Sequence, residues 1–114
     1  MAITPATYNI RPQRRADYPL TVTFKDGDGN VIDLTGYTVL AQVWDKERTS
    51  KVADFTVTID DASTGEVLLT LGYSDTTTLP AESYYDVMLI NPDGLREYYL
   101  EGVVRPSEGY TAPT

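Results

Sequence analysis

The sequence predicts an all-β fold: an antiparallel sandwich of about seven short strands with one short helical turn. Apolar and polar residues alternate over six segments, turn signals follow at near-regular spacing, and no stretch has the period of a long helix. The 114 residues, 41% of them hydrophobic, fit one globular domain with one core.

Residues 1–19 are predicted to form an extended N-terminal arm. Prolines at 5, 12 and 19 block helix formation and remove sheet donors. Only Tyr8–Ile10 has the pattern of a short strand. The segment lacks a full strand pattern, so it is not expected to form a core of its own.

The sandwich domain is expected to span residues 20–106. Its first strands are predicted at Leu20–Lys25, Val31–Leu34, Tyr37–Asp45, Ala53–Ile59 and Glu66–Leu71. A helical turn is predicted at Ser74–Thr78, capped by Ser74 and stopped by Pro80. Leu79 is expected to fill the core beside it.

The stretch Ser83–Arg105 is predicted to be a long antiparallel hairpin. In its turn, Pro92 pre-sets a negative φ and Gly94 accepts a positive one. One face is expected to carry Tyr85, Val87 and Leu89 from the first strand, and Tyr98, Leu100 and Val104, with Gly102 between, from the second. Such a hairpin needs a second layer, which the rest of the chain is expected to supply.

The predicted core is the apolar side of these alternating segments. It consists of Leu20, Val22, Phe24, Leu34, Val39, Ala41, Val43, Phe55, Val57, Ile59, Val67, Leu69, Leu71, Leu79, Val87, Leu89 and Leu100. The size and strand number are immunoglobulin-like, but the Cys…Trp…Cys signature of true immunoglobulin domains is absent. Residues 107–114 are expected to be a flexible C-terminal tail.

Charge and composition exclude several kinds of partner. The net charge is −8, but residues 1–19 carry +2 (three arginines against one aspartate) and the remainder −10 (six basic against sixteen acidic groups). An acidic body repels phosphate backbones, so no nucleic-acid partner is expected. No apolar run approaches the ~20 residues of a membrane span, and no signal peptide is recognised, so no membrane partner is expected.

No catalytic or metal site is predicted. The chain has no cysteine and no histidine, which removes thiolate chemistry and the commonest general base. Asp26, Asp28 and Asn30 begin a calcium-loop spacing, but Val31 and Tyr37 replace the required glycine and acid, which favours a hairpin turn. An adventitious calcium there or at Asp60–Asp61 stays open. No acid lies in a clearly apolar setting, so neither an enzyme nor a cofactor is expected.

The order of the turn motifs is more specific than the fold class. The motifs are residues 26–37 (DGDGNVIDLTGY), 41–43 (AQV), 64–67 (TGEV), 79–81 (LPA), 85–87 (YDV), 92–94 (PDG) and 100–102 (LEG). This order resembles the immunoglobulin-like module at the N-terminus of upper-baseplate proteins of tailed bacteriophages, and short stand-alone virion proteins that share the module. The resemblance covers roughly residues 16–105.

The resemblance implies a structural role in the virion, without catalysis or cofactor. Its implied partners are other phage structural proteins and further copies of the chain within the particle. The sequence departs from the family pattern in three places. Ala16 and the Glu82-Ser83 pair stand where glycine is common, and Trp44 stands where arginine or another polar residue is frequent. The first two affect turn geometry, and the third affects the surface.

Three functions remain open at this point. The first is docking on other virion proteins in the tail, baseplate or fibre-attachment region, and the second is capsid decoration by the same fold. The third is a host-glycan-binding adhesin, because some of the tyrosines at 84, 85, 98 and 99 must face outward. The candidate partner-binding residues are Tyr8, Ile10, Arg11, Arg14 and Arg15 in the arm, and Leu40 and Trp44, which face away from Val39, Ala41 and Val43.

Overall fold

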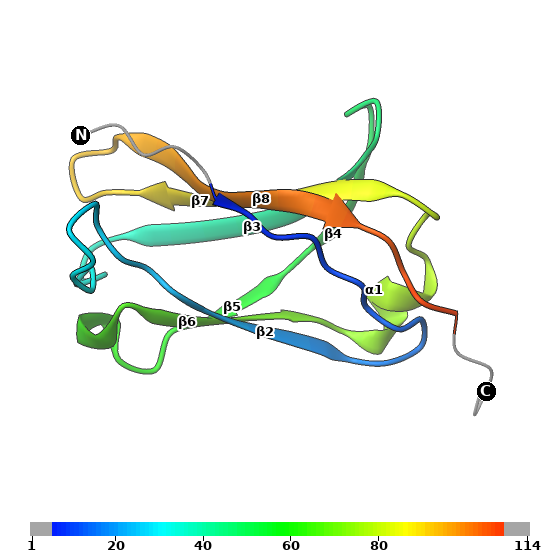
Figure 1. The fold of residues 1–114 in the computed structure, drawn as a ribbon, viewed down its shortest axis with the longest axis horizontal. Helices are drawn as coiled ribbons and strands as arrows, with labels where there is room; N and C mark the ends of the chain where they lie inside the picture. Colours follow the sequence, from blue (N-terminus) through cyan, green and yellow to red (C-terminus); the bar gives the residue numbers. More distant parts are fainter. Residues whose placement is uncertain (1–5, 109–114) are drawn as a thin grey trace.

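Two sheets packed face to face confirm the predicted all-β sandwich (Figure 1). The structure is a computed structural model that describes residues 6–108. One sheet has the strand order β1-β8-β7-β3-β4 and the other β2-β6-β5, and among the strands of the described residues only the β1–β8 pair is parallel. The strands are β1 (Ala6–Thr7), β2 (Tyr18–Thr23), β3 (Thr38–Asp45), β4 (Lys51–Asp54), β5 (Thr56–Thr58), β6 (Glu66–Leu71), β7 (Ser83–Ile90) and β8 (Arg96–Val104).

The core lies between the two sheets and consists of the inward positions of the alternating strands. Most of the predicted core residues are buried, while Leu20, Val57 and Ile59 are half-buried against the core. Alternation therefore located the core correctly. The core also contains four hydrophobic residues outside the predicted set, Ile10, Ala53, Tyr85 and Val104.

The predicted single strand Ala53–Ile59 is two strands in different sheets. β4 pairs with β3, whereas β5 pairs with β6 of the opposite sheet. Phe55 stands at the switch, where its N–H donates to the carbonyl of Ala41 at 3.0 Å and its side chain is buried. The alternation continues unbroken across the switch, because both sheets face the same core.

The segment Val31–Leu34 is not the predicted strand. It forms one isolated bridge, between Val31 and Lys25. The Leu34 N–H instead donates to the carbonyl of Ala62, at 2.8 Å, in the 3-10 turn η1 (Ala62–Thr64). The Leu34 side chain is buried in the core.

The predicted helical turn is present as α1 (Tyr73–Thr77), but its cap differs. Gly72 occupies the N-cap position, and the Asp17 carboxylate accepts a hydrogen bond from the Tyr73 N–H at 2.8 Å. The prediction of Ser74 as the cap is wrong, because Ser74 lies inside the helix and a distant carboxylate supplies the acceptor. Leu79 is buried just after the turn, as predicted.

A β-bulge in β8 decides which tyrosine faces the core. The register between β7 and β8 shifts there, which leaves Tyr99 as the extra residue. Tyr99 packs edge-on against Phe24, with ring centroids 4.6 Å apart, while Tyr98 lies on the outer face. The prediction that Tyr98 shares the inner face with Leu100 is therefore wrong, since strict alternation fails at a bulge.

Residues 6–13 lie along the free edge of β8 (Figure 1). β1 pairs with β8 in parallel, and bridges from Ile10 to Val104 and from Gln13 to Ser107 continue in the same register. These residues are extended, as expected, but they form an edge of the sandwich rather than a separate arm, and β2 starts within the predicted arm. Residues 1–5 of that arm and 109–114 of the predicted tail lie outside the described residues.

Candidate docking surface

The outer face of the five-stranded sheet carries two apolar rows that cross its strands. In one row, Leu40 on β3 lies beside Met88 on β7, which lies beside Tyr98 on β8. Leu40 is 44% exposed and Tyr98 45% exposed. Neighbouring strands place such side chains in mutual contact. The row is therefore a continuous apolar strip in water.

The second apolar row crosses the same strands near their other ends. Trp44 on β3 lies beside Tyr84 on β7, and Tyr84 lies beside Val103 on β8. Tyr84 is 42% exposed, and Trp44 is half-buried. The two rows, which we call the docking surface together with the polar row between them, bring the predicted residues Leu40 and Trp44 onto one face.

The polar row consists of Gln42, Asp86 and Glu101 on the same three strands. Burial raises the pKa of the Asp86 carboxyl above its ordinary value; Arg48 opposes this shift and Glu101 adds to it. A carboxylate held between apolar rows and beside a second carboxylate favours a partner that brings a donor or a cation.

Contacts within the chain hold Trp44 in one orientation. Its indole N–H donates to the Gln42 side-chain oxygen at 2.8 Å, and the Arg48 guanidinium lies 4.2 Å from the ring centroid. Arg48 follows Asp45 in a tight turn, in which the Asp45 carboxylate accepts bonds from the Thr49 N–H and hydroxyl. The turn therefore fixes the cation over one face of the indole.

Two shallow hollows lie on either side of Trp44. The larger, of about 210 Å³, is lined by Leu40, Met88 and Tyr98, and the smaller, of about 170 Å³, by Lys46 and Tyr84. Trp44, Gln42, Arg48 and Asp86 line both of them. This shallow relief suits a broad contact with another surface rather than the enclosure of a small molecule.

The predicted residues of the arm lie at the sheet edge and largely serve the chain's own fold. Ile10 is 4% exposed within the core, which removes it as an anchor for a partner. The Arg14 guanidinium donates to the carbonyl of Leu79 and pairs with Glu108 at 3.2 Å. Arg15 occupies a turn with a φ of 68°.

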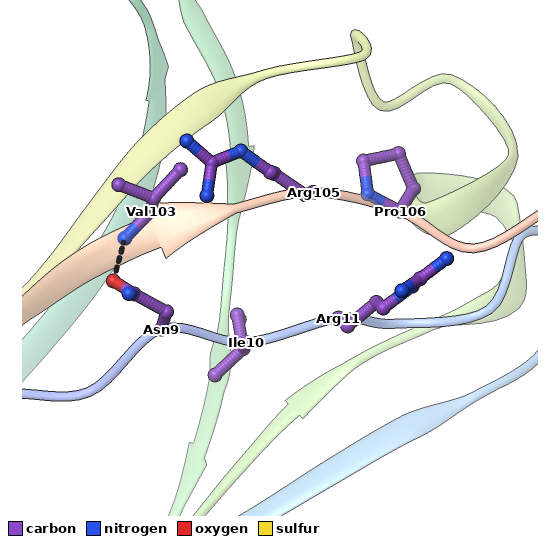
Figure 2. A pocket seen from close by; sticks show the side chains of 6 residues that line it. All are labelled: Asn9, Ile10, Arg11, Val103, Arg105 and Pro106. Carbon is purple, nitrogen blue, oxygen red and sulfur yellow. Dashed lines mark hydrogen bonds between the residues drawn. The ribbon is translucent and has the colours of Figure 1, made fainter.

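Tyr8 and Arg11 remain accessible from outside. Tyr8 is 51% exposed, although its carbonyl accepts a hydrogen bond from the buried Tyr85 hydroxyl. Arg11 lines a hollow of about 370 Å³ between the arm and β8, opposite Arg105 (Figure 2). Figure 2 also shows the Asn9 side chain beneath Val103, whose N–H donates to it at 3.0 Å.

Sequence reasoning missed Tyr84, Met88, Asp86 and Tyr98 as parts of the docking surface. The alternation that places Tyr85 and Val87 in the core also sends the first three outward, so their positions were available from the sequence. The outward position of Tyr98 was not available from the sequence, because it depends on the bulge at Tyr99. No residue type in the sequence marks that bulge.

The acidic turns are shaped by hydrogen bonds to backbone N–H groups. The Asp26 carboxylate accepts from the N–H groups of Asp28 and Asn30, at 2.9 and 3.0 Å, which is ordinary turn chemistry. Within residues 6–108, no group of three or more acidic side chains is placed to hold a metal ion.

Neither a protein-family model nor a curated protein matches the chain. In the part of the chain that the structure describes, no helix has the length and apolar character needed to cross a membrane.

Proposed function

We propose that the chain is a non-enzymatic structural protein of a tailed-bacteriophage virion, which docks on other virion proteins in the tail, baseplate or fibre-attachment region. The observation that carries the docking is the pair of apolar rows on the outer face of the five-stranded sheet. The virion assignment is supported by the order of sequence motifs between residues 16 and 105. The prediction that the protein is a component of the virion follows from the same resemblance.

The docking surface has the composition of an interface centre. Trp44, Tyr84 and Tyr98 supply aromatic area, and Leu40 and Met88 fill the space beside them. Tryptophan and tyrosine contribute strongly to binding because they bury much area while losing few rotatable bonds. A neighbouring protein that covers both rows would remove this apolar area from water.

The position of Arg48 favours a protein partner over a glycan. A sugar-binding platform needs an open aromatic face, whereas the guanidinium lies over one face of the Trp44 ring. The polar row instead offers the acceptors Asp86 and Glu101, which suit donors from a facing protein. The glycan-binding alternative predicts specific binding on a glycan array, and the proposal predicts none.

The test compares two exposed leucines on different surfaces. Leu40 lies on the docking surface, and Leu95, 64% exposed, lies in the β7–β8 turn. Leu40→Asp should leave the fold intact by circular dichroism but reduce incorporation of the protein into purified particles, because it places a charge in the contact. Leu95→Asp is the matched control and should be incorporated like the wild type.

Equal incorporation of both variants would refute docking through this surface. A cryo-EM map of particles that contain the wild-type protein tests the location. Density in the tail or baseplate supports the proposal, whereas density on the capsid shell supports the decoration alternative. Absence from purified particles would overturn the virion assignment.

A further inference from the structure

We propose that residues 6–14 form an exchangeable strand, which can pair with β8 of a second copy of the chain instead of its own β8. We call residues 6–14 the edge strand. Reciprocal exchange between two copies gives a closed two-fold dimer in which the β8 edge of each copy is paired. This inference depends on the sheet edge alone and not on the docking surface or the virion assignment.

The seat for the edge strand is built into β7 and β8. Gly102 on β8 has no side chain, and a Cβ there would lie 2.1 Å from the carbonyl oxygen of Tyr8. The buried Tyr85 on β7 donates its hydroxyl to that same oxygen. Because every copy carries the same seat on β7 and β8, the seat can receive the edge strand of another copy as well as its own.

The backbone of the edge strand pairs with β8 and the residues that follow it. The Tyr8 N–H donates to the carbonyl of Glu101 at 2.9 Å, and the Ile10 N–H donates to that of Val103 at 2.9 Å. The Ser107 N–H donates to the carbonyl of Pro12 at 2.8 Å. The same contacts form between copies after exchange, so the exchange loses none of them.

A single residue separates the edge strand from the body. Arg14 pairs with Glu108, beyond β8 on the side of the seat, and donates to the carbonyl of Leu79, which follows α1 in the body. On the other side, the Ala16 carbonyl accepts from the Thr76 hydroxyl at 2.8 Å, and Asp17 binds the start of α1. Arg15 lies in the turn between Arg14 and Ala16, where the edge strand meets the body.

The backbone of Arg15 favours opening of this hinge. Its φ of 68° lies in the left-handed region, which is unfavourable for a residue with a Cβ. The turn around it is closed by a hydrogen bond of 3.3 Å from the Ala16 N–H to the Gln13 carbonyl. An extended Arg15 relieves the unfavourable φ and directs the edge strand to a neighbour, as short strained hinges do in strand exchange.

Cross-linking between two single-cysteine variants tests the exchange directly. The chain has no cysteine, and the parallel register places Thr7 beside Glu101. Thr7→Cys and Glu101→Cys are mixed, warmed through unfolding, cooled and oxidised. We expect a disulfide-linked pair in several-fold excess over a control in which Thr49→Cys, exposed in the β3–β4 turn, replaces Glu101→Cys. A yield equal to that control would overturn the proposal.

Substitution of the hinge residue provides a second test, in two opposite directions. Arg15→Gly removes the cost of the positive φ in the monomer, so dimerisation should weaken by roughly tenfold per hinge. Arg15→Pro cannot adopt that φ and should strengthen dimerisation by a similar factor. Light scattering after size exclusion, over a range of protein concentrations, measures both.

Equal dimerisation of the wild type and Arg15→Gly, or stronger dimerisation of Arg15→Gly, would contradict the hinge. If Arg15→Pro fails to fold, the cross-linking and the glycine variant still decide the matter. A dimer in which Thr7→Cys of one copy does not cross-link to Glu101→Cys of the other would have formed through another interface. That result would overturn the exchange.

Discussion

At the scale of single residues, Gly102 shows how a missing side chain can determine topology. If β8 were the edge of the sheet, a larger residue could occupy this position. The carbonyl of Tyr8 occupies the space that a Cβ would need, at 2.1 Å. Glycine at this position therefore allows a further strand to lie close against β8.

Gly102→Ala is expected to lower the free energy of unfolding by about 1–3 kcal/mol, because the edge strand must move away to accommodate the methyl group. Gly27→Ala is the matched control, since a Cβ at Gly27 would meet no atom within 4 Å apart from those of its chain neighbours. Urea titration followed by circular dichroism measures both. An equal effect of the two substitutions would show that the close approach at Gly102 is unimportant.

The Tyr85 hydroxyl, which binds the edge strand, makes the stability of the folded state depend on pH in the alkaline range. Burial, with smaller contributions from Tyr18 and Tyr8, raises the pKa of its hydroxyl above the ordinary value of about 10. The folded state therefore holds this proton more tightly than the unfolded state. The resulting stability is fully present below the unfolded pKa and is lost as the pH rises above about 10.

We expect the free energy of unfolding to fall above pH 10 by about 1.4 kcal/mol per pH unit from Tyr85 alone. Tyr85→Phe should be less stable at neutral pH, because the Tyr8 carbonyl loses its donor, but should lose less stability with rising pH. Tyr73→Phe, which alters an exposed tyrosine, should keep the wild-type slope. Chemical denaturation at a series of pH values gives the slopes.

At the scale of elements, the edge strand is a short segment held to the sandwich by two buried apolar side chains, Ile10 and Pro12, as well as by backbone bonds. Ile10 is buried among core residues, whereas the next residue, Arg11, is exposed. A variant that lacks residues 2–15 would lose Ile10 from the core, so it should be less stable whether or not the segment takes part in docking.

Ile10→Ala should lower the free energy of unfolding by about 2–4 kcal/mol, since it removes buried methyl groups and leaves a cavity beneath the edge of the sheet. Arg11→Ala should change it by less than about 0.5 kcal/mol. Thermal unfolding of the two variants measures the difference. A small effect of Ile10→Ala would mean that the edge strand contributes little to the core.

The sequence predicted strand existence better than strand partnership. Alternation identified the core faces of β2, β3, β6 and β7, because one buried face imposes a period of two. It could not reveal that β4 and β5 belong to different sheets, because the period is the same in both. The bulge in β8 and the parallel pairing of β1 depend on contacts between distant residues, which a local pattern does not contain.

At the scale of the whole molecule, the docking surface and the edge strand occupy different parts of the five-stranded sheet. The docking surface covers its outer face across β3, β7 and β8, and the edge strand covers the free side of β8. The sequence alone could predict that Leu40 and Trp44 point outward from the same face of one strand. Their association with residues of β7 and β8 required the register of the sheet.

Trp44→Ala should leave the chain folded, because the side chain is only half-buried and lies outside the core. It should weaken docking by about 2 kcal/mol or more, as expected for an aromatic residue at the centre of an interface. Incorporation into particles, relative to Tyr73→Ala on α1, measures the effect. An unfolded Trp44→Ala protein would mean that the residue belongs to the core.

The parallel pairing of residues 6–13 with the last strand has a consequence for the timing of folding in the cell. The edge strand is synthesised before β7 and β8, and its seat on them is completed only after Ser107 has been added. At ordinary rates of synthesis this interval is on the order of ten seconds. During that time the segment has no completed seat on its own chain, and a second copy whose own edge strand has left its seat could receive it.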